Sequence, residues 1–125
     1  MPRFGKKSRE RLKGVDSRLV NVMNEVIKMM DITIIEGVRS QERQLELLES
    51  GATKVKHSKH MDGKAVDVAP YPIDWGDRDR FHYMGGMIMG ASQQMGIKIR
   101  FGGDWNMNGI ISDNYFDDLV HFELV

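Results

Sequence analysis

Hydrophobic residues recur at three- and four-residue intervals in the segment that follows Asp16 and Ser17. Such spacing places apolar side chains on one face of an α-helix, and Asp or Ser commonly caps the first turn. The sequence therefore predicts a helix from this point to about Met30. Its expected buried face comprises Leu19, Val20, Met23, Val26, Ile27 and Met30.

Two further helices are predicted by their caps and their apolar spacing. Ser40 can cap a helix that runs through Leu48, and Gly51 follows where a left-handed residue commonly ends a helix. A longer helix is expected from Asp77 to about Met95. Its expected inner face comprises Phe81, Met84, Ile88 and Met89.

Short stretches between these helices have the composition and alternation of β-strands. β-Branched residues dominate residues 31–36, and apolar residues alternate with others in 64–69, 97–101 and 120–124. We therefore predict the α+β fold class, with a small, mostly antiparallel sheet and helices packed on one of its faces.

Length and overall charge exclude several classes of protein. A chain of 125 residues predicts one domain that spans residues 1–125. The 18 basic and 18 acidic residues balance, which argues against a dedicated nucleic-acid-binding protein. No apolar run approaches the ~18 residues of a membrane span. We expect a monomer.

Residues 1–15 form a basic segment with a single acidic residue, Glu10. We interpret it as a flexible solvated tail or a frayed first helix, because charge runs are usually solvated. A functional alternative is attraction to anionic lipid head groups or wall polymers. The segment lacks the apolar stretch of a secretory signal, so we expect the protein to stay in the cytoplasm until something else releases it. The basic residues are Arg3, Lys6, Lys7, Arg9, Arg11 and Lys13.

Three residues from distant parts of the chain are candidate metal ligands. His60 and Asp67 are seven residues apart, and Gly63 between them lets the backbone turn. Asp67 lies on a predicted strand between small alanines of the same face, which leaves room for an ion. His121, on the last predicted strand, offers a third ligand. Two histidines and one carboxylate leave one position of tetrahedral zinc for water, as in catalytic sites, and we place this zinc on the open face of the sheet.

The order of these residues resembles that of the zinc peptidases that cut peptidoglycan peptides. Residues 58–67 match Ser-x-His-x-x-Gly-x-Ala-x-Asp, and residues 118–121 match Asp-x-x-His. Residues 37–40 and 101–105 are similar to the Arg-Ser and Gly-Gly-Asp-Trp elements of the family. The family includes D-Ala-D-Ala carboxypeptidases and dipeptidases, and the L-alanyl-D-glutamate peptidase endolysins of tailed phages. The resemblance covers residues 32–125 in the expected order.

The resemblance implies a zinc endolysin that hydrolyses the L-Ala–D-Glu bond of the peptidoglycan stem peptide, held in the host cytoplasm until it reaches the wall. Asp118 matches the general base of the family, which takes a proton from water and passes it to the leaving amine. We expect its neighbour Asp117 to raise the pKa of Asp118 further by like-charge repulsion.

Three other polar residues have expected roles at this site. Arg39 matches the arginine that holds substrate and the oxyanion of the tetrahedral intermediate, and the plain alternative is a surface ion pair with Glu36 or Glu42. Ser58 is expected to hydrogen bond to substrate or to its own loop, since no histidine is positioned to activate it as a nucleophile. Glu123 shares a strand face with His121 and is expected to orient an imidazole.

Two other functions stay open at this point. D-Ala-D-Ala carboxypeptidase or dipeptidase action belongs to the same family, although a secreted bacterial enzyme would usually carry an export signal. A metal-stabilised binding module without catalysis is the alternative from another class of protein. The presence of both Asp118 and Arg39 argues against that module.

Residues 104–112 form a second candidate cation site. They resemble the first nine positions of an EF-hand calcium loop. At position twelve Tyr115 replaces the usual glutamate, so Asp113, Asp117 or a backbone carbonyl would have to substitute. An ion-free polar turn is an equal alternative. The candidate calcium ligands are Asp104, Asn106, Asn108, Ile110 and Ser112.

The segment 70–77 is predicted to be a loop, because two prolines end the preceding strand. Beside a metal site it could wall the substrate groove, with Tyr71 or Trp75 packing on the substrate. Equally, these aromatic side chains could simply cover the core.

Overall fold

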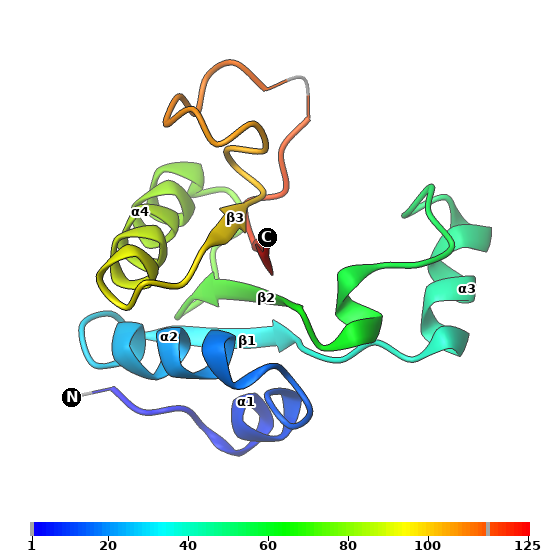
Figure 1. Cartoon of the computed structure of the whole chain (residues 1–125), viewed down its shortest axis with the longest axis horizontal. Coiled ribbons are helices and arrows are strands. Elements are labelled where there is room, and N and C mark those ends of the chain that lie inside the picture. The colour runs from blue at the N-terminus through cyan, green and yellow to red at the C-terminus, as the bar shows by residue number, and fades with distance from the viewer. Residues whose placement is uncertain (1, 115) are drawn as a thin grey trace.

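Four short strands form one antiparallel sheet in the order β1-β2-β4-β3 (Figure 1). The computed structural model describes residues 2–114 and 116–125. The predicted α+β class and antiparallel sheet are confirmed. The strands are β1 Ile32–Glu36, β2 Ala65–Pro70, β3 Ile99–Phe101 and β4 His121–Leu124.

The helices begin and end largely where their caps predicted. The side chains of Asp16, Ser40 and Asp77 each accept a hydrogen bond from a backbone N–H of the first turn. The first predicted helix is shorter than expected and ends at Ile27, because the chain must reverse before it enters β1. The helices are α1 Lys6–Arg11, α2 Ser17–Ile27, α3 Gln41–Ser50 and α4 Arg78–Gln94, with a 3₁₀ helix, η1, at Lys59–Asp62.

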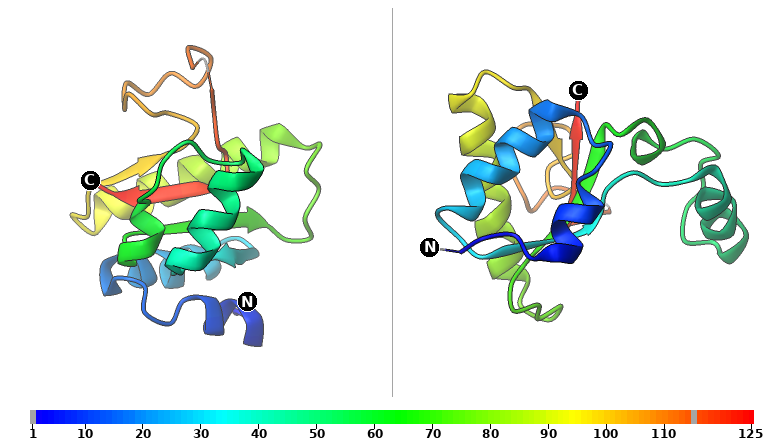
Figure 2. Two further views of the ribbon diagram at one scale, coloured as in Figure 1. Left: turned by 90° about the vertical axis from the view of Figure 1, so that its right-hand side faces the viewer. Right: turned by 90° about the horizontal axis from the view of Figure 1, so that it is seen from below.

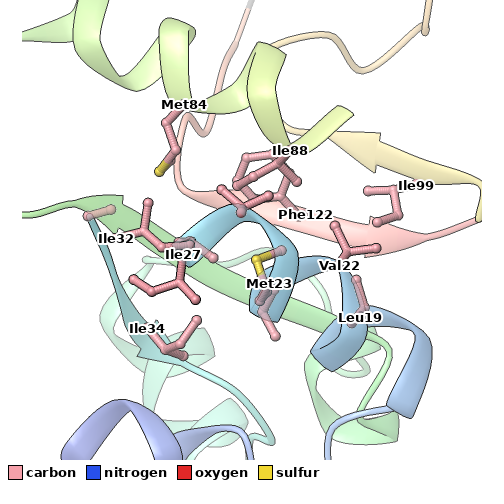
Figure 3. Packing of buried hydrophobic residues seen from close by; sticks show 14 of the residues in the cluster. Leu19, Val22, Met23, Ile27, Ile32, Ile34, Met84, Ile88, Ile99 and Phe122 are labelled. Atoms are coloured by element: carbon pink, nitrogen blue, oxygen red, sulfur yellow. The ribbon is translucent and has the colours of Figure 1, made fainter. Parts of the chain in front are cut away.

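Helices α2 and α4 pack against each other and cover one face of the sheet, where the hydrophobic core lies (Figure 3). From the sheet, Val66, Val68 and Phe122 are completely buried in this layer. Because side chains alternate along a strand, burial of the two valines turns Asp67 to the opposite face. The polar residues of β2 and β4 therefore project from the face that these helices leave uncovered. Core side chains in Figure 3 include Leu19, Met23, Ile32, Met84 and Ile88.

The basic N-terminal segment is not a solvated tail. It contains α1, and the apolar side chains of Phe4, Leu12 and Val15 are buried in the core. The Ser8 hydroxyl accepts a hydrogen bond of 3.0 Å from the backbone N–H of Ile34, which ties α1 to β1. The charged side chains remain in solvent, as expected. The charge run had hidden the apolar positions that anchor the segment.

The same segment supports two loops that lead into the polar face of the sheet. A Cβ atom on Gly37 would lie 1.8 Å from the carbonyl oxygen of Arg11, and one on Gly63 would lie 2.5 Å from that of Gly14. Gly63 also accepts a hydrogen bond of 2.8 Å from the N–H of Asp16. Only glycine permits such close backbone approaches, so residues 11–16 fit against both loops from behind.

Helix α3 and the loop after it project away from the sheet as an arm, which we define as residues 41–57 (Figures 1 and 2). In α3 only Gln44 is buried, and Gly51 ends the helix with a left-handed φ of 80°. Within the described ranges, we find no helix of the length and apolar character needed to span a bilayer.

Candidate metal centre

His60, Asp67 and His121 meet on the polar face of the sheet. Asp67 and His121 are register partners on β2 and β4, and His60 reaches them from η1. His60 Nε2 lies 3.1 Å from Asp67 Oδ1, and His121 Nδ1 lies 3.3 Å from the same oxygen. One ligand atom from each residue falls within 4.8 Å of the other two, a spacing at which the three could hold a metal ion.

Local sequence explains how His60 reaches the strand pair. The Ser58 hydroxyl accepts a hydrogen bond of 3.1 Å from the N–H of His60 and so caps η1. Gly63 then adopts a left-handed φ of 70°, which lets the chain turn at once into β2. The expected hydrogen bond of Ser58 to its own loop is therefore present.

Each imidazole is held by a second acceptor on its far nitrogen. His60 Nδ1 lies 2.9 Å from the carbonyl oxygen of Gly37, and His121 Nε2 lies 2.9 Å from Glu123 Oε1. Those acceptors favour a proton on the far nitrogen of each ring, so the nitrogen that contacts Asp67 would bind a metal once it carries no proton. The predicted orienting role of Glu123 toward an imidazole is thus supported by direct contact.

In the metal-free chain, His60, Asp67 and His121, which we call the cluster, shift pKa values among their members and neighbours. Burial acts to raise the pKa of Asp67, but hydrogen bonds from His121 and His60 outweigh it and hold that pKa well below its usual range. Burial acts to lower the pKa of His121, yet its bonds to Asp67 and Glu123 raise it to about 9. The hydrogen bond from His121 lowers the pKa of Glu123 to about 2. Asp67 is therefore ionised at neutral pH, as a metal ligand would need to be.

Asp118 stands beside the cluster with a raised pKa. Burial is the main cause and the charge of Asp67 is the second. The expected contribution from Asp117 is wrong, because the Asp117 carboxylate pairs instead with the exposed guanidinium of Arg78 at 2.5 Å. Gly102 holds Asp118 in place: a Cβ atom there would lie 2.1 Å from the Asp118 carbonyl oxygen.

A cavity of about 840 Å³ connects the cluster with the arm. Asp118 and Arg39 line it together with the three candidate ligands, and Leu47 and Val55 of the arm form part of the opposite wall. Trp105 and Phe116, from the long loop before β4, also line it. The cavity is large enough for several residues of an extended peptide.

Arg39 combines both of its expected environments. Its Nε donates a hydrogen bond of 2.6 Å to Glu36, so the ion-pair alternative is observed, and its guanidinium also lines the cavity. Its Nη2 also donates to Glu36, and its Nη1 donates a bond of 3.0 Å to Gln44, whose own amide donates to the carbonyl of Val55 at 2.8 Å. Sequence reasoning missed Gln44, because a single glutamine on a polar helix carries no local signal of burial.

Trp105 is a second residue whose surroundings the sequence did not reveal. Its ring lies between Phe116, at 6.3 Å between ring centroids, and His121, at 5.5 Å. Its indole Nε1 is enclosed without a hydrogen-bond partner among the described residues. Trp105 thus packs directly against a candidate ligand.

The candidate calcium loop is closed by its own polar side chains. Asp104 and Asn106 both accept hydrogen bonds from the N–H of Asn108, at 3.3 Å each, so their oxygens converge. Asp104 also accepts from Gly109 at 2.8 Å, and Asn108 donates to Asp113 at 2.5 Å. Position twelve, Tyr115, lies outside the described residues. Asp117, a candidate substitute for the missing glutamate, is paired with Arg78.

Three comparisons with known proteins agree. A family model described as phage L-alanyl-D-glutamate peptidase matches residues 1–125. The L-alanyl-D-glutamate peptidase of Escherichia phage T5 is 34% identical over 138 residues, which cover 98% of each chain. The crystal structure of the Serratia marcescens L-Ala D-Glu endopeptidase ChiX superposes with a TM-score of 0.82 at 28% identity, over 98% of this chain and 90% of that one.

Proposed function

The chain belongs to the phage L-alanyl-D-glutamate peptidase family, and on that premise we propose that it hydrolyses the L-Ala–D-Glu bond of the peptidoglycan stem peptide. One observation carries the proposal: two imidazoles and a carboxylate converge in a peptide-sized cavity that a spare acid, Asp118, also lines. Both named relatives carry this activity in their names over nearly the whole chain. They favour it over D-Ala-D-Ala carboxypeptidase or dipeptidase action and over a non-catalytic binding module.

We assign zinc to the site, with His60, Asp67 and His121 as its ligands. Neutral imidazole nitrogens and one ionised carboxylate form a donor set that suits zinc, and the far nitrogen of each ring is already engaged. Zinc bound there would lower the pKa of a water molecule and polarise the scissile carbonyl. One chain supplies all three ligands, which supports a monomer as the active form.

Asp118 and Arg39 supply the remaining chemistry. The raised pKa of Asp118 suits a group that takes a proton from the attacking water and returns it to the amine of the departing D-Glu. Arg39, held by Glu36 and Gln44, presents fixed N–H donors to a substrate carboxylate or to the oxyanion that develops at the scissile carbonyl. Ser58 lines the same cavity and can donate its hydroxyl proton to substrate while it accepts from His60.

Digestion of purified peptidoglycan tests this function. The zinc-loaded protein should release fragments with new D-Glu amino termini and new L-Ala carboxyl termini, identified by mass spectrometry, and chelation should stop the reaction. Release of free D-Ala would support the carboxypeptidase instead. Binding to the wall without any new termini would support the binding module.

We also propose calcium as a second cation, bound by Asp104, Asn106, Asn108, the carbonyl of Ile110 and Ser112. The converging oxygens of Asp104 and Asn106 support this, and the loop leads directly to Asp118. Millimolar calcium should then raise the melting temperature or activity of the zinc-loaded protein, and Asp104→Ala should abolish that response. An unchanged melting curve and rate would identify an ion-free turn.

The phage relative supports one further proposal, about location. The protein would remain in the host cytoplasm until another factor gives it access to the wall. Fractionation of infected or expressing cells, before and after the membrane is permeabilised, would show whether wall cleavage begins only after permeabilisation.

A further inference from the structure

Trp75 is an exposed aromatic residue near one end of the sheet. It lies in the loop between β2 and α4, and 63% of its surface is open to solvent. Tyr71 on the same loop is also mostly exposed, whereas Trp75 covers the core residue Phe81 with one face of its ring. An exposed indole is available to stack on the flat apolar face of a ligand.

The structure fixes the orientation of this indole. Its ring stacks on the buried ring of Phe81, with 5.5 Å between centroids and 19° between planes. The Arg80 guanidinium donates hydrogen bonds of 2.8 Å to the carbonyls of both Pro72 and Tyr71, which hold the loop against α4. Trp75 therefore presents one face as a rigid platform.

The platform adjoins the metal site through Asp118. Trp75 and Phe81 line a cavity of about 200 Å³ together with Asp118 and Leu119. Asp118 also lines the large cavity that holds the candidate metal ligands. A ligand that occupies both cavities would pass the proposed general base on its way from the scissile bond to the indole.

The chemistry of the substrate indicates what would lie there. In peptidoglycan, L-Ala is joined to the lactyl group of N-acetylmuramic acid, so a single amino acid separates the sugar from the scissile bond. One extended residue spans about 3.5 Å, which keeps the sugar close to the reacting carbonyl. A pyranose ring has an apolar C–H face that packs well on an indole, and the small cavity suits one ring better than a peptide chain.

We propose that Trp75 is a stacking platform for the muramyl sugar, so that the enzyme recognises L-Ala joined to the glycan rather than the bare stem peptide. This inference rests on the proposed L-Ala–D-Glu cleavage. It assigns the sugar side of the substrate to the Asp118–Trp75 side of the cleft and the D-Glu side to the arm.

The test compares two substrates with the zinc-loaded full chain. One is an N-acetylmuramyl tripeptide that begins with L-Ala–D-Glu, and the other is the same tripeptide without the sugar. The wild type should show a lower KM for the sugar-bearing substrate. Trp75→Ala should raise that KM roughly three- to tenfold, as expected for the loss of one aromatic contact, and should leave kcat/KM on the bare peptide within about twofold.

Two further variants separate recognition from folding. Trp75→Phe keeps an aromatic ring over Phe81 and should retain most of the preference for the sugar. Tyr83→Ala removes an aromatic ring of similar exposure, 64%, that lines neither cavity. It should leave the KM for both substrates unchanged. Titration with N-acetylmuramyl-L-alanine should shift the tryptophan fluorescence of the wild type, and the shift should be smaller in Trp75→Ala, which retains only Trp105.

Three results would overturn the inference: equal KM values for both substrates in the wild type, an equal loss on both in Trp75→Ala, or no fluorescence shift in the wild type. A wild type that cuts neither substrate would instead overturn the proposed function. Cleavage of the bare peptide with no benefit from the sugar would leave that function intact and remove only the platform.

Discussion

The two walls of the large cavity differ in how they are supported. The wall that carries the candidate ligands consists of β2, β4 and η1, and the opposite face of the two strands is packed with core side chains such as Val66 and Phe122. The arm, which forms the other wall, buries only Gln44 from its helix and stands clear of the sheet (Figure 2). The candidate ligands thus lie on the well-packed wall, and the arm forms the less well-packed wall that would face them across a bound substrate.

The arm is connected to the rigid wall mainly through polar groups. The N–H of Arg39 donates to the carbonyl of His60 at 3.0 Å, and the Arg39 side chain binds Gln44. Few apolar contacts support these bonds, so local opening of the arm should cost much less free energy than unfolding of the sheet. Opening of the arm would widen the cavity without changing the arrangement of the three candidate ligands.

Removal of a ligand from the rigid wall should give the largest effect. His60→Ala deletes one of three proposed zinc ligands, so we expect loss of stoichiometric zinc and a fall in kcat of more than about 10³-fold. Metal analysis and peptidoglycan turnover should be measured on the same sample. Full zinc content with normal activity would show that His60 is not a zinc ligand.

Asp118→Asn should preserve the rigid wall but remove its proton acceptor. Zinc content should stay the same, and kcat should fall by about 10² to 10⁴-fold, the usual contribution of a general base. Asp117→Asn is the matched control, because its carboxylate faces Arg78 rather than the cluster, and it should cost less than about threefold on a sugar-free peptide. Equal losses in both variants would remove Asp118 from the mechanism.

Zinc affinity should increase with pH, because the metal and a proton compete for His121. In the metal-free chain the pKa of this residue is about 9, so zinc must displace a proton at any lower pH. The apparent affinity should therefore rise about tenfold per pH unit, or roughly a hundredfold from pH 7 to 9. Competition with a chelator of known affinity would measure it.

A matched variant tests whether His121 causes this rise of zinc affinity with pH. Glu123→Gln removes the negative charge that helps to hold the proton on His121. The rise in zinc affinity should then level off at a lower pH than in the wild type. An affinity that stays constant from pH 7 to 9 in the wild type would show that His121 loses no proton on binding.

The smallest effect is expected from loosening the arm. Gln44→Met keeps the side-chain volume but leaves the Val55 carbonyl without its partner and removes one of the two partners of the Arg39 guanidinium, which keeps its pair with Glu36, at a cost of about 1–3 kcal/mol. Amides of residues 41–57 should exchange roughly tenfold faster by hydrogen–deuterium exchange, with zinc content unchanged. Amides of β2 and β4 serve as the internal control, and faster exchange there would show that the two walls are one cooperative unit.

Much of the sheet and its polar face could be predicted from sequence. Alternation around Asp67 and His121 located two strands with polar faces, and caps such as Ser40 located helix starts. These signals are local, since a strand or helix repeats its pattern over a few residues. The family resemblance supplied what periodicity could not, namely that residues 54 positions apart face one another.

Features that depend on tertiary contacts escaped prediction. Phe4 and Leu12 anchor α1, but the charges between them suggested a tail. The burial of Gln44 follows from partners on another segment, and the pairing of Asp117 with Arg78 joins residues 39 positions apart. No short window of sequence contains both members of such a pair.

The glycine contacts behind the metal site have a practical consequence for mutational scans. Residues 11–16 do not line the large cavity, but they pack against the backbone of Gly37 and Gly63. The Gly37 carbonyl in turn accepts the hydrogen bond from His60. Low activity of a variant at residues 11–16 would thus indicate that the His60 imidazole is displaced. The metal content of such a variant should be measured before its loss of activity is attributed to a lost substrate contact.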